Sequence, residues 1–212
     1  MIIVLFGKPG AGKGTQAPLL ARKLGVPTLA TGDVLRAARR AGTALGREAQ
    51  SFMDKGELVP DSVILGILRE ELSKPEYGKG VVLDGAVRTV PQAEGVKTML
   101  GTLGRKVDAV LALDVDNEEI VRRLSARTVC EKCQTPYMGR EPGASCDKGD
   151  GGTLVRRKDD EPTAIRTRLG VYDMETAPVL EWYGDAGDTV VVVDALGTVD
   201  DVTKRVMQAL EQ

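Results

Sequence analysis

Short apolar segments alternate along the chain with longer segments in which apolar residues recur at helical spacing. A run of valine, leucine and isoleucine without polar alternation is typical of a parallel strand that is buried on both faces. We expect such strands over 1–6, 27–30, 81–83, 107–115 and 190–193. The helical spacing predicts helices over 13–24, 33–73, 91–100, 118–126, 160–182 and 199–210. This order predicts an α/β fold in which a five-stranded parallel sheet is flanked by helices.

One segment, 128–158, interrupts this pattern. It contains all three cysteines of the chain, and a glycine-rich stretch lies near its end. Neither the strand nor the helical periodicity continues through it. We therefore expect a small inserted subdomain here, separate from the core of the sheet.

Composition excludes several kinds of function. The formal net charge is −2, which indicates no basic surface for nucleic acid or an anionic membrane. The chain has no histidine, which excludes phosphohistidine intermediates, serine–histidine–aspartate catalysis and histidine-based metal sites. The apolar N-terminal run is too short for a signal sequence, and no run approaches a membrane span. We therefore expect a cytoplasmic protein without nucleic-acid or membrane partners.

A glycine-rich motif follows the first predicted strand and precedes the first predicted helix. It reads Gly7-Lys8-Pro9-Gly10-Ala11-Gly12-Lys13-Gly14-Thr15, and this context is typical of the phosphate loop of a P-loop NTPase. In such a loop, backbone N–H groups and a helix N-terminus face one anion. We expect the loop to bind a nucleoside triphosphate through Gly10, Ala11, Gly12, Lys13, Gly14 and Thr15. The Lys13 ammonium would contact the β- and γ-phosphates, and the Thr15 hydroxyl would bind Mg²⁺. Gly14 departs from the general pattern, which has Ser or Thr after the lysine.

Asp84 comes directly after the apolar run 81–83. Ligands of open α/β sheets bind at the carboxyl ends of the strands. We therefore expect Asp84 to hold Mg²⁺ through a water molecule, together with Thr15. The Asn-Lys-x-Asp motif that reads guanine in GTPases is absent, because the single asparagine, Asn117, is followed by Glu118.

Several further motifs follow in an order and spacing that resemble the adenylate kinase family. The phosphate loop continues as Gly-Lys-Gly-Thr-Gln up to Gln16, the form found in nucleoside-monophosphate kinases. The other segments are Thr31-Gly32-Asp33-Val34-Leu35-Arg36, Gly56-Glu57-Leu58-Val59-Pro60, Leu83-Asp84-Gly85, Arg88-Thr89-Val90-Pro91-Gln92-Ala93, Arg127, Arg157-Lys158-Asp159-Asp160 and Arg168. The resemblance runs from Met1 to about Leu180, and more loosely to the end.

The resemblance implies a kinase that transfers the γ-phosphoryl of ATP to AMP. Its domains would be a core (1–29, 60–126 and 166–212), an AMP-binding insertion (30–59) and a lid (127–165). AMP would be bound by Thr31, Arg36, Glu57, Leu58, Val59, Gly85, Ala86, Val87, Arg88, Gln92, Arg157 and Arg168. Beyond the phosphate loop, ATP would contact Arg127, Tyr137 and Gly197. The transferring phosphates would be neutralised by Lys13, Arg88, Arg127, Arg157 and Arg168. We expect a monomer whose small-molecule partners are ATP, AMP and ADP.

Two departures from the family concern the AMP segment and the lid hinge. The family usually has Phe-Pro where this chain has Ala86 and Val87, so we expect a less rigid segment and weaker AMP binding. The glycine that usually precedes the lid arginine is Ala126, which would stiffen the hinge.

The cysteines indicate a metal site in the lid. Cys130-Glu131-Lys132-Cys133 is a Cys-x-x-Cys turn, and Cys146 follows it with Asp147 and Asp150 nearby. Such spacing is typical of tetrahedral zinc sites. A subgroup of long-lid adenylate kinases carries a fourth cysteine or an aspartate here, and aligning back from 157–160 places Asp150 in that position. We therefore expect Cys130, Cys133, Cys146 and Asp150 to bind a structural Zn²⁺. The alternative is a metal-free lid whose cysteines are reduced or reversibly oxidised.

Two other functions fit parts of the pattern. A UMP/CMP kinase would share the fold, but Thr31 and Gln92 favour AMP, because pyrimidine kinases of this fold tend to have Ala at the first position. A nucleotide-dependent switch or a metal-sensing protein would explain the phosphate loop and the cysteines without catalysis. The many arginines of the motifs favour the kinase.

Overall fold

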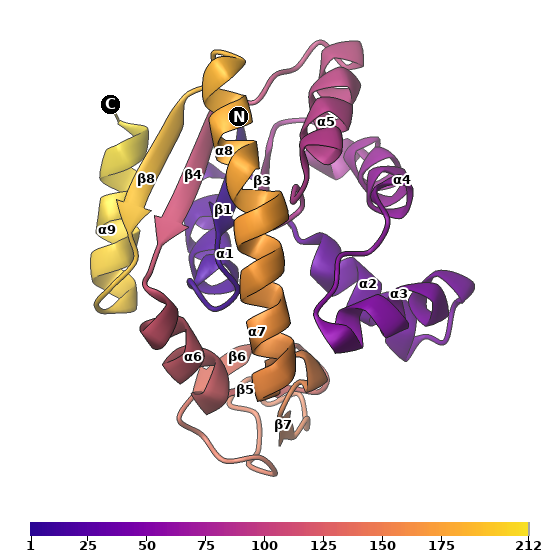
Figure 1. Ribbon diagram of the computed structural model, residues 1–212, viewed down its shortest axis with the longest axis vertical. Coiled ribbons are helices and arrows are strands. Elements are labelled where there is room, and N and C mark those ends of the chain that lie inside the picture. The colour runs from indigo at the N-terminus through magenta and orange to yellow at the C-terminus, as the bar shows by residue number, and fades with distance from the viewer. Residues whose placement is uncertain (212) are drawn as a thin grey trace.

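The computed structural model describes residues 1–211 and contains a parallel sheet with the strand order β2-β3-β1-β4-β8 (Figure 1). The strands are β1 (Ile2–Gly7), β2 (Thr28–Leu29), β3 (Val81–Asp84), β4 (Ala109–Asp114) and β8 (Val190–Asp194). Every neighbouring pair in this sheet is parallel. The predicted fold class and the strands read from the apolar runs are confirmed, with bounds that differ by a few residues.

Alternate residues of the central strand β1 belong to two different cores. Ile2, Val4 and Phe6 pack in a cluster with helices α4 (Asp61–Leu72), α5 (Val90–Thr102) and α8 (Ala177–Asp185). Ile3 and Leu5 pack on the other face with α1 (Lys13–Leu24) and α9 (Val199–Leu210). Because successive side chains of a strand point to opposite faces, an uninterrupted apolar run supplies both cores at once.

The predicted helical stretch 33–73 is divided into three helices. They are α2 (Thr31–Arg40), α3 (Ala44–Lys55) and α4, and the first two project away from the sheet (Figure 1). Thr43 caps α3, since its hydroxyl accepts a hydrogen bond from Gly46 N at 3.1 Å. Gly56 ends α3 with φ of 79°, a left-handed conformation that glycine adopts without strain. Pro60 then precedes α4. Gly56 and Pro60, which interrupt the helical pattern in the sequence, therefore lie at helix ends in the structure.

The segment after β4 forms the inserted subdomain. Helix α6 (Asn117–Ala126) leads into a small antiparallel sheet, with the order β6-β5-β7, that lies at the end of the molecule away from the chain termini (Figure 1). Its strands are β5 (Arg127–Cys130), β6 (Pro136–Met138) and β7 (Leu154–Val155). A separate cluster of Cys130, Cys146 and Leu154 forms its interior. The predicted break in the core pattern over 128–158 is therefore a distinct small sheet.

The predicted helix 160–182 is interrupted twice. It begins as a 3₁₀ turn, η2 (Lys158–Asp160), continues as α7 (Pro162–Val171), and passes through a π-helical segment, η3 (Tyr172–Thr176), into α8. Pro178 has no N–H for the α-helical bond to the carbonyl of Met174, and a wider turn accommodates this loss. A short 3₁₀ helix, η1 (Pro75–Tyr77), precedes β3. Within the described residues, none of these helices is both long enough and apolar enough to span a membrane.

Two leucine-to-alanine substitutions, one at a buried and one at an exposed position, test whether the sheet forms the core of the protein. Leu111 in β4 is 0% exposed, whereas Leu103 after α5 is 47% exposed. We expect Leu111→Ala to lower the free energy of unfolding by about 2–5 kcal/mol, because it leaves a cavity between packed layers. Leu103→Ala should change it by about 0.5 kcal/mol or less. Urea unfolding of both variants measures the difference, and equal losses would contradict this assignment of the core.

Candidate functional site

The phosphate loop lies between β1 and α1, at the carboxyl edge of the sheet. Gly10 and Gly12 have φ of 85° and 99°, so the loop curls through conformations that favour glycine. Among residues 1–211, no side chain caps α1 and no acid lies in its first turn. The first N–H groups of α1 are therefore available to an anion, and the helix dipole favours one there. The expected loop geometry is present.

Lys13 and Asp84 face each other beside this loop. The Lys13 ammonium donates to Gly7 O at 2.5 Å and to Lys8 O at 3.0 Å. Burial lowers the pKa of Lys13 to about 7, and the attraction of Asp84 opposes this shift. Burial likewise raises the pKa of Asp84, while Lys13 lowers it. A Cβ on Gly14 would lie 3.6 Å from Asp84 Oδ2, so Asp84 reaches the first turn of α1, which also carries Thr15. Hard oxygen ligands on this turn and on β3 suit Mg²⁺.

Two neighbouring clefts share part of their lining. The first lies between α5 and the segment that contains α2 and α3, called the flap below. It is lined by Thr31, Gly32, Leu35, Arg36, Met53, Gly56, Glu57, Leu58, Val59, Ile64, Ala86, Arg88, Gln92, Arg157, Asp159 and Arg168. The second reaches the phosphate loop and is lined by Leu5, Phe6, Gly7, Pro9, Lys13, Gly56, Leu58, Gly85, Val87, Arg88, Arg168, Val171, Tyr172 and Thr176. Arg88 and Arg168 line both clefts, so each cation can reach ligands in either one.

The expected AMP-binding residues therefore lie around one cleft or the other. Thr31, Arg36, Glu57, Leu58 and Val59 line the first cleft. Gly85 and Val87 line the second, and Ala86 lines the first. Ala86 and Val87 are each 1% exposed, so these departures from the family alter the packed walls of the clefts.

Three arginines are held by two consecutive carboxylates. Asp159 accepts from Arg157 Nε at 2.8 Å, and Asp160 accepts from Arg127 Nε at 2.8 Å. Arg168 NH1 lies 3.3 Å from Asp159 Oδ2 and 3.1 Å from Asp160 Oδ1. Burial raises the pKa of Asp159, but Arg157 and Arg168 outweigh it and hold that pKa well below its usual range. The two carboxylates keep the arginines close together. The oxygens of an anionic substrate could replace these carboxylates as hydrogen-bond partners of the arginines.

Asp159 and Asp160 were expected only as parts of a motif, and their pairing with the three arginines was not predicted from the sequence. The available signal was that two acids directly follow three basic residues and precede a helix. One of these pairs joins Arg127, at the start of β5, to Asp160, which lies 33 residues later in the chain. Sequence spacing alone does not define such a contact.

The three ATP contacts expected beyond the phosphate loop, Arg127, Tyr137 and Gly197, are not among the residues that line the two clefts. The Tyr137 hydroxyl lies 3.3 Å from Cys146 Sγ and accepts a hydrogen bond from Asp147 N at 3.2 Å. Its polar end therefore faces the cysteine cluster. Gly197 follows β8, and a Cβ there would lie 3.3 Å from the Arg205 guanidinium. The contacts of these three residues with ATP therefore stay predictions.

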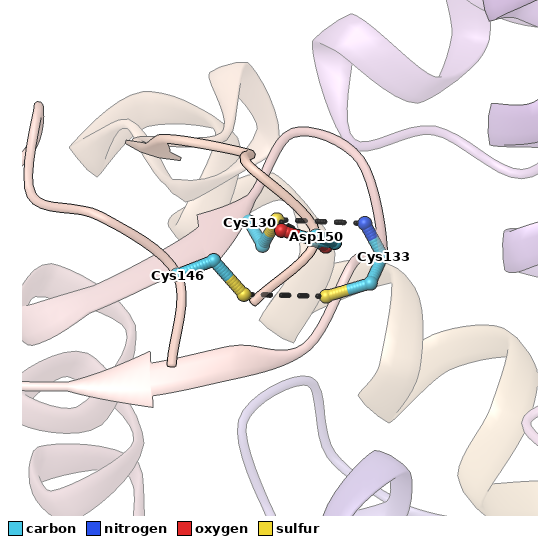
Figure 2. A group of neighbouring side chains, drawn as sticks. All are labelled: Cys130, Cys133, Cys146 and Asp150. Atoms are coloured by element: carbon cyan, nitrogen blue, oxygen red, sulfur yellow. Dashed lines mark hydrogen bonds between the residues drawn. The ribbon is translucent and has the colours of Figure 1, made fainter. Parts of the chain in front are cut away.

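The lid brings its four candidate ligands together (Figure 2). One ligand atom each of Cys130, Cys133, Cys146 and Asp150 lies within 4.8 Å of all the others. The backbone N–H groups of Lys132 and Cys133 donate to Cys130 Sγ, and that of Lys148 donates to Cys146 Sγ, each at 3.4 Å. Burial raises the pKa of Cys130 to about 11, and its backbone bonds oppose that shift, whereas hydrogen bonds, first that of Tyr137, lower the pKa of Cys146. Three sulfurs and one carboxylate, two of the cysteines buried, fit a tetrahedral metal site. Asp147 instead pairs with Arg140.

Comparisons with known proteins agree with this geometry. The family model for adenylate kinase matches residues 5–188. The chain is 59% identical over 211 residues to the adenylate kinase of Gemmatimonas aurantiaca, a match that covers 99% of each chain. It is 44% identical over 216 residues to that of Methanocella arvoryzae, covering 100% of this chain and 99% of the relative. It is 42% identical over 215 residues to that of Staphylococcus epidermidis, with the same coverage.

The matches extend through the phosphate loop, the flap and the lid, and therefore include every segment that forms the two clefts. On the strength of the shared loop, the joined clefts and these full-length matches, the chain belongs to the adenylate kinase family.

Proposed function

We propose that this chain transfers the γ-phosphoryl group of ATP to AMP and forms two molecules of ADP, an activity that balances the adenine nucleotide pool. The observation that supports this most is the pair of joined clefts. One cleft reaches the phosphate loop, the other has an apolar and amide-lined end, and Arg88 and Arg168 line both. Two nucleotides bound in these clefts would bring their phosphates together at these cations.

The reaction requires charge neutralisation more than proton transfer. The attacking atom is a phosphate oxygen that is already anionic, so no general base is needed. Its approach to the γ-phosphoryl group is opposed by repulsion between anions. Lys13, Arg88, Arg127, Arg157 and Arg168 would offset that repulsion, because planar guanidinium groups bind phosphate oxygens in pairs. Thr15 and Asp84 would hold Mg²⁺, which supplies further positive charge next to the phosphates of ATP.

Residues 30–59 and 127–165 would act as an AMP-binding flap and a lid around the core. Helix α3 of the flap contacts η2 and α7, and Lys158 Nζ lies 3.8 Å from Asp54 Oδ2. These contacts support a closed arrangement in which both segments cover the phosphates. Closure would exclude water and so prevent transfer to water in place of AMP. The monomeric state and the cytoplasmic location stay predictions from the sequence.

Zn²⁺ is the metal that the donor set of the lid favours. Thiolates select soft or borderline cations, whereas Mg²⁺ takes oxygen ligands. All four positions of a tetrahedral ion would be filled by Cys130, Cys133, Cys146 and Asp150, which leaves none for a substrate. The ion would therefore stabilise the small lid sheet and take no part in phosphoryl transfer.

The acceptor specificity tests the proposed activity. We expect ADP formation from ATP and AMP with Mg²⁺, and much slower phosphorylation of UMP and CMP, because Thr31 and Gln92 suit a purine end. A coupled assay of the purified chain with each monophosphate measures this. Faster turnover of UMP or CMP would support a pyrimidine kinase, and ATP hydrolysis without any phosphorylated acceptor would support a nucleotide-dependent switch.

Removal of one bridging cation tests the arrangement of the site. We expect Arg88→Ala to lower kcat by about 10²–10³-fold, because one preorganised charge at the transferring phosphates is lost. The control is Arg69→Ala, which removes an exposed arginine of α4 outside both clefts. Steady-state kinetics and thermal unfolding of both variants separate catalysis from folding. A near-normal kcat for Arg88→Ala would contradict the proposed role.

Metal content tests the lid site. We expect about one zinc ion per chain, and its loss in Cys130→Ala or Asp150→Ala, with a lower unfolding temperature because structural zinc contributes folding free energy. Asp147→Ala is the matched control, since Asp147 pairs with Arg140 outside the ligand set. Elemental analysis and calorimetry provide the measurements, while phosphoryl transfer at low temperature should persist. Wild-type protein without stoichiometric metal would favour the metal-free lid.

A further inference from the structure

The first cleft has one end that is suited to a nucleobase. Its buried neutral polar side chains, Thr31 and Gln92, are 2% and 1% exposed, and they lie among apolar residues of the flap and α4. The charged residues that line this cleft include Arg36, Arg88, Arg157 and Arg168. Phosphate oxygens would bind to the arginines, so the base would meet Gln92.

The amide of Gln92 has one defined orientation. Its Nε2 donates to Asp61 Oδ1 at 2.7 Å, and its Oε1 accepts from Arg88 N at 2.8 Å. A carboxylate oxygen only accepts and a backbone N–H only donates. Both neighbours therefore require the same orientation, which distinguishes the amide nitrogen from the oxygen on chemical grounds.

Asp61 is itself held in place by a second hydrogen bond. It is the first residue of α4, and its Oδ1 also accepts from Thr89 Oγ1 at 3.0 Å. Thr89 caps α5 by accepting from Gln92 N at 3.2 Å, and it is 9% exposed. The side chains of Asp61, Thr89 and Gln92, together with the backbone N–H of Gln92, form a closed ring of hydrogen bonds. Rotation of the Gln92 amide by half a turn would place its oxygen against the carboxylate and its NH₂ against the N–H of Arg88.

This orientation matters because purines differ in the order of hydrogen-bond donor and acceptor at positions 1 and 6, the edge with which an amide can pair. A 6-aminopurine presents an acceptor at N1 and a donor at N6, whereas a 6-oxopurine presents a donor at N1 and an acceptor at O6. The Gln92 amide retains one free N–H and one free lone pair after its bonds to Asp61 and Arg88. A freely rotating amide could pair with either purine, but a fixed amide can match only one donor–acceptor order.

We propose that Asp61 is a specificity-determining positioning residue, which fixes the Gln92 amide so that 6-oxopurine monophosphates are rejected in favour of AMP. Asp61 makes no contact with the base in this arrangement and acts through Gln92. The inference rests on the proposed function, in which AMP occupies the first cleft.

The test compares kcat/KM for AMP and for inosine monophosphate in wild type and variants. Asp61→Asn is the sharpest change, because asparagine keeps the shape but can turn either its carbonyl or its NH₂ toward Gln92. We expect the ratio of AMP to inosine monophosphate to fall by roughly tenfold or more, the discrimination that one hydrogen bond to a charged group supports. Most of the change should be a lower KM for inosine monophosphate. Asp61→Ala should act in the same direction.

Two comparisons exclude a merely structural effect. Asp188→Ala removes another partly buried carboxylate, which pairs with Lys97 at 2.7 Å away from the clefts, and should leave the ratio unchanged. In a Gln92→Ala background, Asp61→Asn should cause no further fall in the ratio, because Asp61 acts only through the amide. Thermal unfolding verifies that each variant folds, and Asp61→Asn alone decides the question if Asp61→Ala does not fold.

The outcomes separate this inference from the proposed function. An unchanged ratio in Asp61→Asn, or the same fall with Gln92 already removed, would overturn the role of Asp61 while AMP remains a substrate. Absence of AMP phosphorylation in wild type would instead overturn the proposed function on which the inference rests.

Discussion

The pairing of arginines with Asp159 and Asp160 is the interaction on which the rest of the site depends. Burial is the main cause that lowers the pKa of Lys13, and the positive charges of Arg88, Arg168 and Arg127 lower it further, so these arginines lie close enough to act on the phosphate loop. Such a concentration of positive charge inside a protein is costly unless carboxylates compensate it. Asp159 and Asp160 lie in the short turn η2 between the lid sheet and α7, so this one turn compensates arginines from both segments.

The same pairing links the charge cluster to motion of the lid. Arg127 begins β5 and Asp160 ends η2, so their hydrogen bonds join the entry and the exit of the lid sheet. Phosphates that bind the arginines would compete with these carboxylates. On the proposed function, substrate binding and the position of the lid would then be coupled through the same arginines.

The lid sheet and the part of the first cleft around Gln92 are stabilised in two different ways. The buried cluster of the lid sheet consists of Cys130, Cys146 and Leu154. Three residues are too few for a stable core, and four converging ligands suit a metal in its place. The part of the cleft around Gln92 instead relies on a ring of directional hydrogen bonds around Asp61. Each bond in this ring includes a group that can only donate or only accept. The ring therefore fixes which end of the Gln92 amide donates to a ligand and which end accepts.

Local patterns in the sequence determined the elements and the chemistry of the loop. The apolar runs predicted β1, β3, β4 and β8 because a strand buried on both faces needs no polar alternation. The spacing of Gly10, Gly12 and Lys13 predicted the phosphate loop, since its conformation depends on adjacent residues. The Cys-x-x-Cys turn likewise indicated a metal site, and alignment from the end of the lid identified Asp150 rather than Asp147 as its neighbour.

Tertiary structure alone decided which distant groups meet. Asp61 and Gln92 are 31 residues apart, and only the packing of α4 against α5 brings them within hydrogen-bonding distance. The same holds for Arg127 with Asp160, and for the Tyr137 hydroxyl, which the lid sheet directs toward Cys146. The periodicity of a sequence specifies which face of an element is buried, but not its partner. Contacts between side chains of different elements depend on the crossing of helices and strands, and this geometry exists only once the chain is folded.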